Sequence, residues 1–218
     1  MAKDPYRKLA ARYDRFVGPL TNALRHRGVN LYPPKPGMKV LEVGCGTGTN
    51  LMLYRQAGCS VYGIDLSPSM LDVACAKLGK GAELQLGNAS NISYQDNFFD
   101  LVIAMFTLHE MPSEIRPQVM KEMTRVAKKE GRILIIDFHP GQIRSLRGWM
   151  YKAFILFIER VAGREHYSNY REFLSRKGLP GLIETQGLIV DRQRIVRAGH
   201  IAFFLTGKCL PVLAGQAG

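Results

Sequence analysis

The chain has 218 residues, is 46% hydrophobic and carries a formal charge of +12 at pH 7. This length suits one α/β core domain with additions, large enough to need no disulfide or metal for stability. Its four cysteines show neither C-x-x-C spacing nor a nearby histidine pattern, so neither a disulfide framework nor a zinc site is expected. A secretory-type apolar segment and a run of about 20 apolar residues are both missing from the sequence, which leads us to expect a cytoplasmic protein, soluble or peripheral to a membrane.

The positive charge is concentrated in two parts of the chain. Residues 1–39 hold nine Lys and Arg against two Asp, a net charge of +7, and residues 140–199 hold eleven basic against five acidic residues, a net charge of +6. The part between them is close to neutral. This distribution fits plain solubility as well as a surface for anionic lipid or nucleic acid.

An N-terminal helix is predicted over residues 9–24, where Leu9, Tyr13, Phe16 and Leu20 form one apolar stripe. The Pro-rich segment 32–37 then breaks the chain before the core. We therefore expect an N-terminal helical cap of residues 1–36, a core of residues 37–208 and a flexible tail of residues 209–218.

Strands and helices alternate strictly through the middle of the chain. This alternation predicts parallel strands joined by right-handed crossovers, which is a doubly wound α/β sheet. The expected strands are residues 39–43, 60–64, 83–86, 99–105 and 132–137. The expected helices are one that runs through residue 57, one that begins at Ser67-Pro68, and one around residues 115–127.

The final third of the chain departs from this rhythm. Residues 142–162 predict a long helix, and residues 169–185 predict another that is interrupted at Pro180-Gly181. Two strands are expected at residues 188–197 and 201–208, joined near Gly199. Such a hairpin requires at least one antiparallel strand, so we expect a seven-stranded, mostly parallel sheet that ends in an antiparallel hairpin strand.

Three glycines follow the first predicted strand in the segment VLEVGCGTGTN, residues 40–50. A glycine turn of this kind lets a ligand approach the backbone, and the start of the next helix favours a carboxylate or phosphate. Oxidoreductases place their glycines as G-x-G-x-x-G, whereas Gly44, Gly46 and Gly48 are spaced as G-x-G-x-G after Glu42. Asp65 follows about 20 residues later, at the end of the second strand.

These motifs, with Asn88-Ala89 after the third strand, the N-x-F-D-L-V run of residues 97–102 and the FTLH segment of residues 106–109, resemble class I S-adenosylmethionine-dependent methyltransferases. The resemblance is greatest to the ubiquinone/menaquinone and phospholipid methyltransferase branches. It implies a Rossmann-like methyltransferase fold, S-adenosylmethionine as cofactor and S-adenosylhomocysteine as product.

The resemblance also implies roles for particular residues. The glycine turn would line the methionine portion of the cofactor, and a carboxylate on the second strand would bind the ribose hydroxyls. The implied cofactor-binding residues are Tyr13, Gly44, Cys45, Gly46, Thr47, Gly48, Asp65, Leu66, Met70, Asn88, Ala89 and Met105. Four of them have a competing interpretation: Gly48 as a packing glycine, Asp65 as a carboxylate that only leads into the next helix, Met70 as plain core and Tyr13 as a surface tyrosine. Asn88 departs from the family, which usually has Asp at this place.

Catalytic residues are harder to assign. Methyl transfer from a sulfonium is an in-line displacement, so alignment supplies much of the rate. An acceptor that must lose a proton needs a base near the strand ends, where His109 and His139 are the candidates. A histidine at such a place is more often packed or in contact with solvent than catalytic, and no metal site is expected.

The helix predicted over residues 142–162 gives the best indication of the acceptor. Its apolar arc is wider than one face needs and is flanked by basic residues, which suits a lid at about residues 141–170 over a lipophilic pocket, or a contact with an anionic membrane. Packing on the sheet or on a second subunit is the alternative. We therefore expect a small lipophilic acceptor, quinone-like or lipid-like, and a monomer or homodimer. An RNA or DNA methyltransferase is the second candidate, although the D/N/S-P-P-aromatic motif is missing after the fourth strand, and a non-catalytic nucleotide-binding module is the third.

Overall fold

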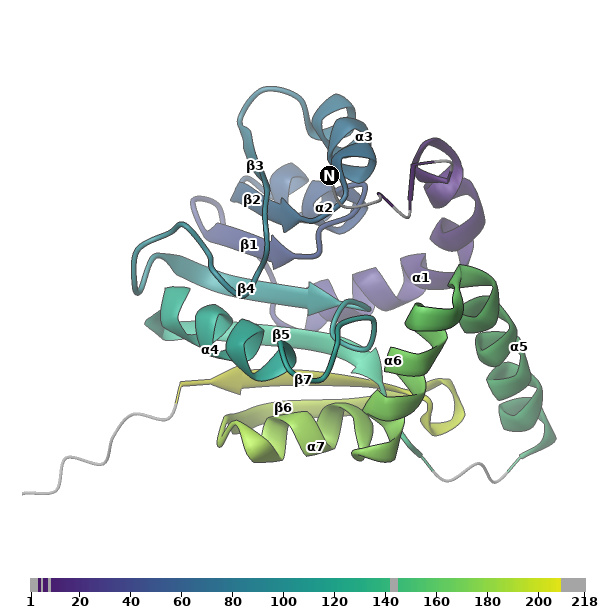
Figure 1. Cartoon of the computed structure of the whole chain (residues 1–218). Helices are drawn as coiled ribbons and strands as arrows, with labels where there is room; N and C mark the ends of the chain where they lie inside the picture. The colour runs from purple at the N-terminus through teal and green to yellow at the C-terminus, as the bar shows by residue number, and fades with distance from the viewer. Residues whose placement is uncertain (1–3, 5, 8, 142–144, 209–218) are drawn as a thin grey trace, which may run out of the picture.

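The computed structural model describes residues 4, 6–7, 9–141 and 145–208, so the expected tail of residues 209–218 lies outside the described residues. The described chain forms one seven-stranded sheet flanked by helices (Figure 1). The strands are β1 (Lys39–Val43), β2 (Ser60–Asp65), β3 (Ala82–Leu86), β4 (Phe99–Met105), β5 (Ala127–Phe138), β6 (Ile189–Val196) and β7 (Ile201–Gly207). The helices are α1 (Ala10–Leu31), α2 (Thr49–Gln56), α3 (Pro68–Leu78), α4 (Arg116–Val126), α5 (Leu146–Ala162), α6 (Arg164–Ser175) and α7 (Gly178–Thr185).

The strand order is β3-β2-β1-β4-β5-β7-β6. The pairs from β3 to β5 are parallel, and β7 runs antiparallel to β5 on one side and to β6 on the other. This confirms the predicted doubly wound sheet with one antiparallel strand in its C-terminal hairpin. The order reverses between β1 and β4, so the carboxyl ends of these two strands flank the crevice where such sheets bind ligands.

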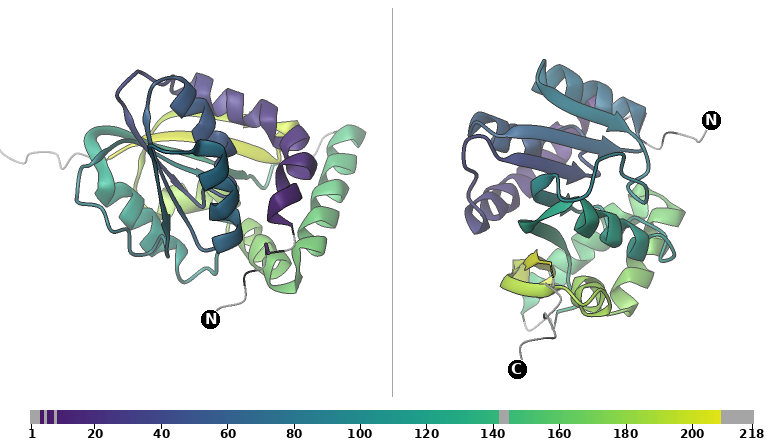
Figure 2. Two further views of the ribbon diagram at one scale, coloured as in Figure 1. Left: turned by 90° about the horizontal axis from the view of Figure 1, so that it is seen from above. Right: turned by 90° about the vertical axis from the view of Figure 1, so that its left-hand side faces the viewer.

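The central strands are apolar on both faces because helices cover both. Val40, Leu41 and Val43 of β1 are fully buried, and so are residues 101–104 of β4. In Figure 1, α1 lies behind the sheet while α4 and α7 lie in front of it, and Figure 2 shows these layers from two further sides. The core therefore fills the space between the sheet and each helical layer.

The first helix is longer than predicted, because α1 continues to Leu31 rather than ending near residue 24. Its second half packs closely on the sheet. A Cβ on Gly28 would lie 2.9 Å from Cδ1 of Ile136 in β5. A glycine at the contact point carries no hydrophobic signal, which is why the apolar stripe in the sequence seemed to end early.

The prediction of one helix over residues 169–185 with a break at Pro180-Gly181 is wrong. The structure has two helices, α6 and α7, and they are separated at Lys177. Lys177 has a φ of 67°, a left-handed conformation that ends α6. Pro180 falls in the first turn of α7, where a missing N–H removes no helical hydrogen bond.

Two further boundaries differ from the prediction. β5 begins at Ala127 instead of residue 132, and within the described residues the long helix of the final third, α5, begins at Leu146. Residues 142–144, which the prediction placed in that helix, lie outside the described residues. None of the helices formed by the described residues is both long and apolar enough to cross a bilayer.

Candidate functional site

The turn between β1 and α2 is a bend of bare backbone. Gly44, Gly46 and Gly48 have φ values of 65°, 52° and 71°, which side chains rarely tolerate. A Cβ on Gly46 would meet no atom of the described residues within 4 Å, whereas one on Gly48 would lie 2.8 Å from Cδ1 of Leu78 in α3. Gly46 therefore leaves room for a ligand, and Gly48 allows α2 and α3 to pack closely.

Asp65, at the end of β2, is tied to this turn. Its Oδ2 accepts a hydrogen bond from the Gly46 N–H at 2.8 Å, and its Oδ1 accepts one from the Ser67 N–H at 2.9 Å. Burial raises the pKa of Asp65, although these backbone hydrogen bonds oppose the shift. Each carboxylate oxygen has a second lone pair, so Asp65 can still accept hydrogen bonds from ligand hydroxyls.

Asp14 attaches α1 to the same turn. Its carboxylate accepts hydrogen bonds from the hydroxyls of Thr47 at 2.6 Å and Thr49 at 2.9 Å, and it pairs with Lys77 of α3 at 2.5 Å. Burial alone would raise the pKa of Asp14, but the bonds from Lys77 and the two threonines lower it overall. Tyr13 is consequently held beside the glycine turn.

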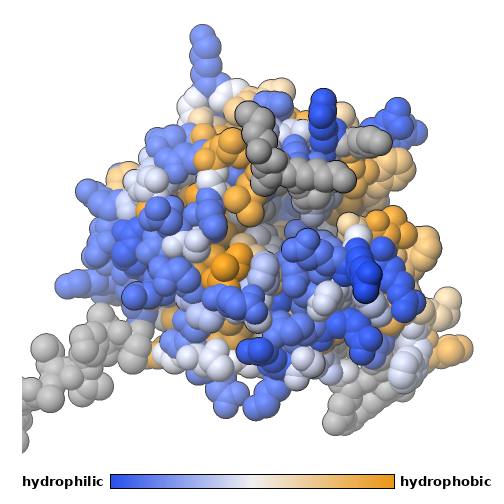
Figure 3. All heavy atoms as spheres, in the orientation of Figure 1, coloured by the Kyte–Doolittle hydropathy of each residue, from blue (hydrophilic) through white to orange (hydrophobic). Residues whose placement is uncertain are grey.

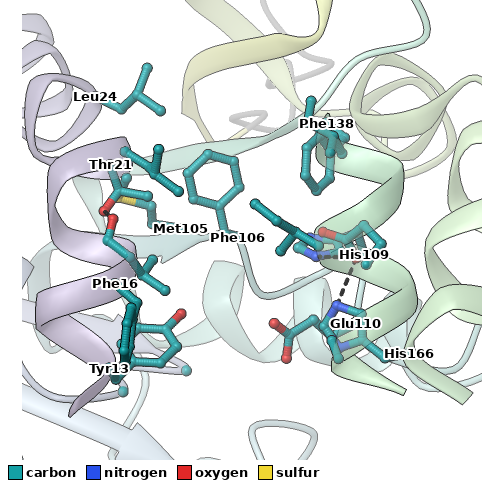
Figure 4. A pocket seen from close by; sticks show the side chains of 18 of the residues that line it. Tyr13, Phe16, Thr21, Leu24, Met105, Phe106, His109, Glu110, Phe138 and His166 are labelled. Carbon is teal, nitrogen blue, oxygen red and sulfur yellow. Dashed lines mark hydrogen bonds and ion pairs between the residues drawn. The ribbon is translucent and has the colours of Figure 1, made fainter. Parts of the chain in front are cut away.

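A cavity of about 500 Å³ opens next to this turn. Its walls come from α1, the turn itself, the end of β4, and the helices α5 and α6. Figure 4 shows Thr21 and Leu24 of α1 on one side, with His109 and His166 on the other. Phe106 lines it with a φ of 54°, an uncommon value for a residue with a side chain.

The mouth of the cavity is apolar. Phe16 of α1 is 59% exposed, and Phe157 and Val161 of α5 are 66% and 72% exposed, yet all three line the cavity. Figure 3 shows hydrophobic atoms gathered on the side of the molecule where α1 and α5 lie. The apolar stripe predicted on the first helix therefore lines this opening.

Asp137, at the end of β5, organises one wall. It is fully buried, and its Oδ2 accepts hydrogen bonds from the backbone N–H groups of Leu108 at 3.0 Å and His109 at 3.3 Å. Its Oδ1 lies 2.8 Å from Nδ1 of His109 and accepts from the Phe138 N–H. Because the Asp137 carboxylate accepts a hydrogen bond here, it keeps a proton of His109 on Nδ1 and directs Nε2 toward α5.

Glu159 of α5 lies between two histidines. Its Oε2 is 3.7 Å from Nε2 of His109 and 2.7 Å from Nε2 of His166 in α6. Burial alone would lower the pKa of His109, but the carboxylates of Asp137 and Glu159 raise it to about 9. The cluster thus places two imidazoles and a carboxylate at one end of the cavity.

Glu110 follows His109 and also lines the cavity. It accepts a hydrogen bond from the hydroxyl of Tyr6 at 3.0 Å, and Tyr6 packs edge-on against Tyr13 with ring centroids 6.1 Å apart. Burial raises the pKa of Glu110, and the nearby imidazoles oppose this shift. Tyr6 therefore lies over the polar end of the cavity.

Glu42 of β1 is the other acidic residue of the cavity wall. It is 3% exposed, and its Oε1 accepts a hydrogen bond from Nδ2 of Asn50 at 2.9 Å. Its Oε2 is buried and has no hydrogen-bond partner among the described residues. Burial raises the pKa of Glu42 to about 8. An unpartnered buried oxygen beside a glycine turn is complementary to a ligand ammonium group.

The predicted site residues fall into two groups along this sheet edge. The first group lines the cavity: Tyr13, Gly44, Cys45, Gly46, Thr47, Met105 and His109. The second group is not among the residues that line the cavity. Gly48 begins α2, and the others lie around the ends of β2 and β3: Asp65, Leu66, Met70, Asn88 and Ala89. Leu66 is 67% exposed, Met70 is buried, and Asn88 accepts a hydrogen bond from the Ser90 N–H within its turn.

His139 lies apart from both groups. Its Nδ1 is 3.0 Å from the carbonyl oxygen of Gly199, and its N–H donates to the carbonyl of His200, so it belongs to the junction between β5 and the C-terminal hairpin. It is not among the residues that line the cavity.

The four ionisable residues that surround His109 were not predicted from the sequence: Glu110, Asp137, Glu159 and His166. Asp137 gave a usable signal, because a charged residue directly after the apolar run ILII, residues 133–136, is unusual in a buried strand. Glu159 and His166 gave none, since they join the site only when α5 and α6 fold over the sheet.

Known proteins resemble the chain in both sequence and structure. The family model described as "Methyltransferase domain" matches residues 41–135. A demethylmenaquinone methyltransferase of Bacillus mycoides is 32% identical over 198 residues, which cover 83% of this chain and 81% of that protein. The crystal structure of a SAM-dependent methyltransferase from Aquifex aeolicus superposes with a TM-score of 0.62 at 23% identity, covering 90% of this chain and 97% of that one.

The sheet order, the bare glycine turn and the carboxylate on β2 define the protein as a Rossmann-like enzyme that binds a nucleoside cofactor at the carboxyl edge of its sheet. The sequence relatives make the class specific. The chain belongs to the class I S-adenosylmethionine-dependent methyltransferases, near the menaquinone branch. Its cofactor is S-adenosylmethionine.

Proposed function

We propose that the methyl acceptor is an aromatic ring that carries hydroxyl groups and an apolar tail, of the naphthoquinol type. The observation that carries the proposal is the form of the cavity, which has mostly apolar walls, an apolar mouth and a largely buried cluster of ionisable side chains at one end. Hydroxyl groups of a ring suit the ionisable end, and a tail suits the mouth between α1 and α5. Relatives at 30% to 32% identity, named demethylmenaquinone methyltransferases, support the same class of acceptor.

The chain's own residues fit the cofactor. The open side of Gly46 accommodates the methionine portion, and the unpartnered Oε2 of Glu42 suits its ammonium group. We assign the ribose to Asp65, the adenine to the residues at the ends of β2 and β3, and the covering role to Tyr13. When bound, S-adenosylmethionine supplies a methyl group on a positively charged sulfur.

The reaction then needs one proton to leave the acceptor. A base takes the proton of a ring hydroxyl, and the neighbouring ring carbon of the phenolate forms a bond to the methyl group while the bond from that methyl to sulfur breaks. The ring-carbon proton then moves to the oxygen, which restores the aromatic ring and leaves S-adenosylhomocysteine. We assign the base to Glu110, because it lines the cavity opposite Tyr13 (Figure 4). His109 is buried, and Asp137 already occupies its Nδ1, so we assign it a positioning role.

We further propose that α5 rests on an anionic membrane, from which the acceptor enters. Leu146, Trp149 and Met150 are 79%, 57% and 66% exposed, and they extend the apolar mouth along the helix. Lys152 lies over the Trp149 ring at 5.4 Å, and Arg160 is exposed on the same helix. An apolar helix face with flanking cations suits the boundary between headgroups and acyl chains.

A panel of acceptors tests the proposal. Purified protein receives radiolabelled S-adenosylmethionine with either a reduced demethylnaphthoquinol that bears a short isoprenoid tail, phosphoethanolamine, or transfer RNA. We expect label only in the naphthoquinol, on a ring carbon. Label in phosphoethanolamine or RNA, with none in the quinol, would reverse the assignment.

A further inference from the structure

Three side chains of types that can bind a metal meet at the polar end of the cavity. The ligand atoms of His109, Glu159 and His166 all lie within 4.8 Å of one another, with separations of 3.7 Å and 2.7 Å from the Glu159 oxygen to the two Nε2 atoms. Ligands of a tetrahedral zinc ion lie about 3.4 Å apart, given bond lengths near 2.1 Å. Small side-chain adjustments therefore bring the three atoms to coordination distance.

The surroundings orient these atoms as they do in known metal sites. Asp137 holds Nδ1 of His109 at 2.8 Å and so points Nε2 at Glu159. A metal would take the place of the proton on Nε2. A carboxylate on the distal nitrogen of a ligating histidine is the usual outer partner of a bound metal, where it fixes the ring and raises its basicity. The backbone bonds that Asp137 accepts fix this pair rigidly in turn.

One oxygen of the buried Glu159 carboxylate lacks a hydrogen bond. Glu159 is 5% exposed, and its Oε2 has no hydrogen-bond partner among the described residues although His166 is close. Glu110 and Asp137 add two further carboxyl groups within the same region. A buried oxygen in an acidic cluster is costly without a compensating cation.

We propose that His109, Glu159 and His166 bind a divalent first-row transition metal such as Zn²⁺. Two histidines and one carboxylate are a common ligand set of catalytic zinc and of non-haem iron. All three residues line the cavity, so the remaining coordination position faces the space that an acceptor would fill. The sequence did not predict this cluster, because His109 is far along the chain from both Glu159 and His166.

The site also suggests a role in the reaction, which rests on the proposed function. An acceptor hydroxyl bound at the open position would lie beside Glu110, and coordination to a dication favours the phenolate that must form. The metal would then hold the ring while Glu110 takes the proton.

Metal binding is tested without cofactor or acceptor. Untagged protein is freed of metal with a chelator and titrated with Co²⁺. The visible d–d absorption of bound Co²⁺ reports nitrogen and oxygen ligands, and thiolate charge-transfer bands would report a cysteine ligand. Calorimetric titration with Zn²⁺ follows. We expect stoichiometric binding with d–d bands and without thiolate bands, and loss of this signal in both Glu159→Gln and His166→Ala.

The control is His26→Ala, which removes an exposed histidine from α1 and should bind as the unaltered protein does. Stabilisation by S-adenosylmethionine verifies that each variant is folded. Binding that is missing in the unaltered protein, or that survives in both cluster variants, overturns the metal site. This test involves no methyl acceptor, so the absence of metal binding would not contradict the quinol proposal. In the same way, the absence of quinol methylation would not contradict an observed metal site.

Discussion

At the level of single residues, the buried carboxylate of Glu42 illustrates how a ligand site costs stability. Its pKa is raised to about 8 by burial, so the folded protein retains a proton between the ordinary glutamate pKa of 4.5 and that value, while the unfolded chain has released it. The free energy of unfolding consequently falls as pH rises through this window, and the loss is constant above it.

Glu42→Gln removes this ionisation. We expect the variant, without ligand, to be more stable at pH 7 by about 2 kcal/mol and to lose part of the pH dependence between 5 and 8. Its affinity for S-adenosylmethionine should fall, because the ammonium loses its anionic partner. Urea denaturation at several pH values measures the first effect, with the exposed Glu130→Gln as control. Equal pH slopes for Glu42→Gln and the unaltered protein would contradict the assigned cause.

Asp65→Ala tests the ribose assignment. We expect S-adenosylmethionine to lose at least about tenfold in affinity, because two charge-assisted hydrogen bonds to the ribose disappear. Isothermal titration measures it, and Asp72→Ala, an exposed aspartate on α3, is the matched control. Normal binding by Asp65→Ala would remove that residue from the site.

At the level of elements, the site depends on how α6 is held over the β4–α4 segment. The buried Arg116 pairs with Glu172 of α6 and donates to the carbonyl of Asn169 at 2.9 Å, and Asn169 donates back to the carbonyl of Glu110 at 2.7 Å. His166 reaches the cavity because this network fixes its helix.

Arg116→Met should therefore lower the free energy of unfolding by about 3 kcal/mol, since it leaves buried acceptors without a donor. Arg176→Met is a demanding control, because Arg176 also pairs with Glu172 but is largely exposed. We expect it to cost less than about 1 kcal/mol. Urea denaturation measures the free energy of unfolding of both variants. Similar decreases in the two would mean that the burial of the Arg116 network does not contribute to stability.

The exposed face of α5 makes a second prediction at this scale. Replacing Trp149 and Phe157 together by alanine should weaken co-sedimentation with vesicles of anionic phospholipid, because both side chains are more than half exposed on the apolar face. Ile195→Ala on β6 removes an exposed apolar side chain elsewhere and should bind as before. An unchanged bound fraction in the double variant would exclude α5 as the contact.

The elements also show what could be predicted from the sequence. β1 and β4 were predicted to the residue, because strands buried on both faces are continuous apolar runs with sharp ends. The break was predicted at Pro180-Gly181 rather than at Lys177, because the first left-handed residue is a lysine and the Pro-Gly pair that follows is the stronger helix-breaking signal. The glycine turn was found because its signal is local. Glu159 and His166 were missed because only the packing of α5 and α6 on the sheet brings them to His109.

At the scale of the whole molecule, two sites share one edge of the sheet. The residues to which we assign the cofactor surround the ends of β1, β2 and β3, while the cavity extends from β4 and β5 toward α1 and α5. The glycine turn lies at their junction, and in our proposal the methyl group passes from cofactor to acceptor at this point.

Ligand-linked stability should reflect this arrangement. We expect S-adenosylmethionine at 100 times its dissociation constant to raise the free energy of unfolding by about 2.7 kcal/mol, and NADH to have no effect. Thermal denaturation with each ligand measures it. Stabilisation by NADH alone would contradict the cofactor assignment.

The most direct measurement for the acceptor is photolabelling of the protein, in the presence of S-adenosylhomocysteine, with a naphthoquinone whose apolar tail carries a diazirine. After digestion and mass spectrometry we expect adducts on peptides from residues 9–24 and 149–166, which line the cavity and its mouth. Adducts confined to the opposite end of the sheet, around residues 117–125 and 186–188, would show that the acceptor does not enter between α1 and α5.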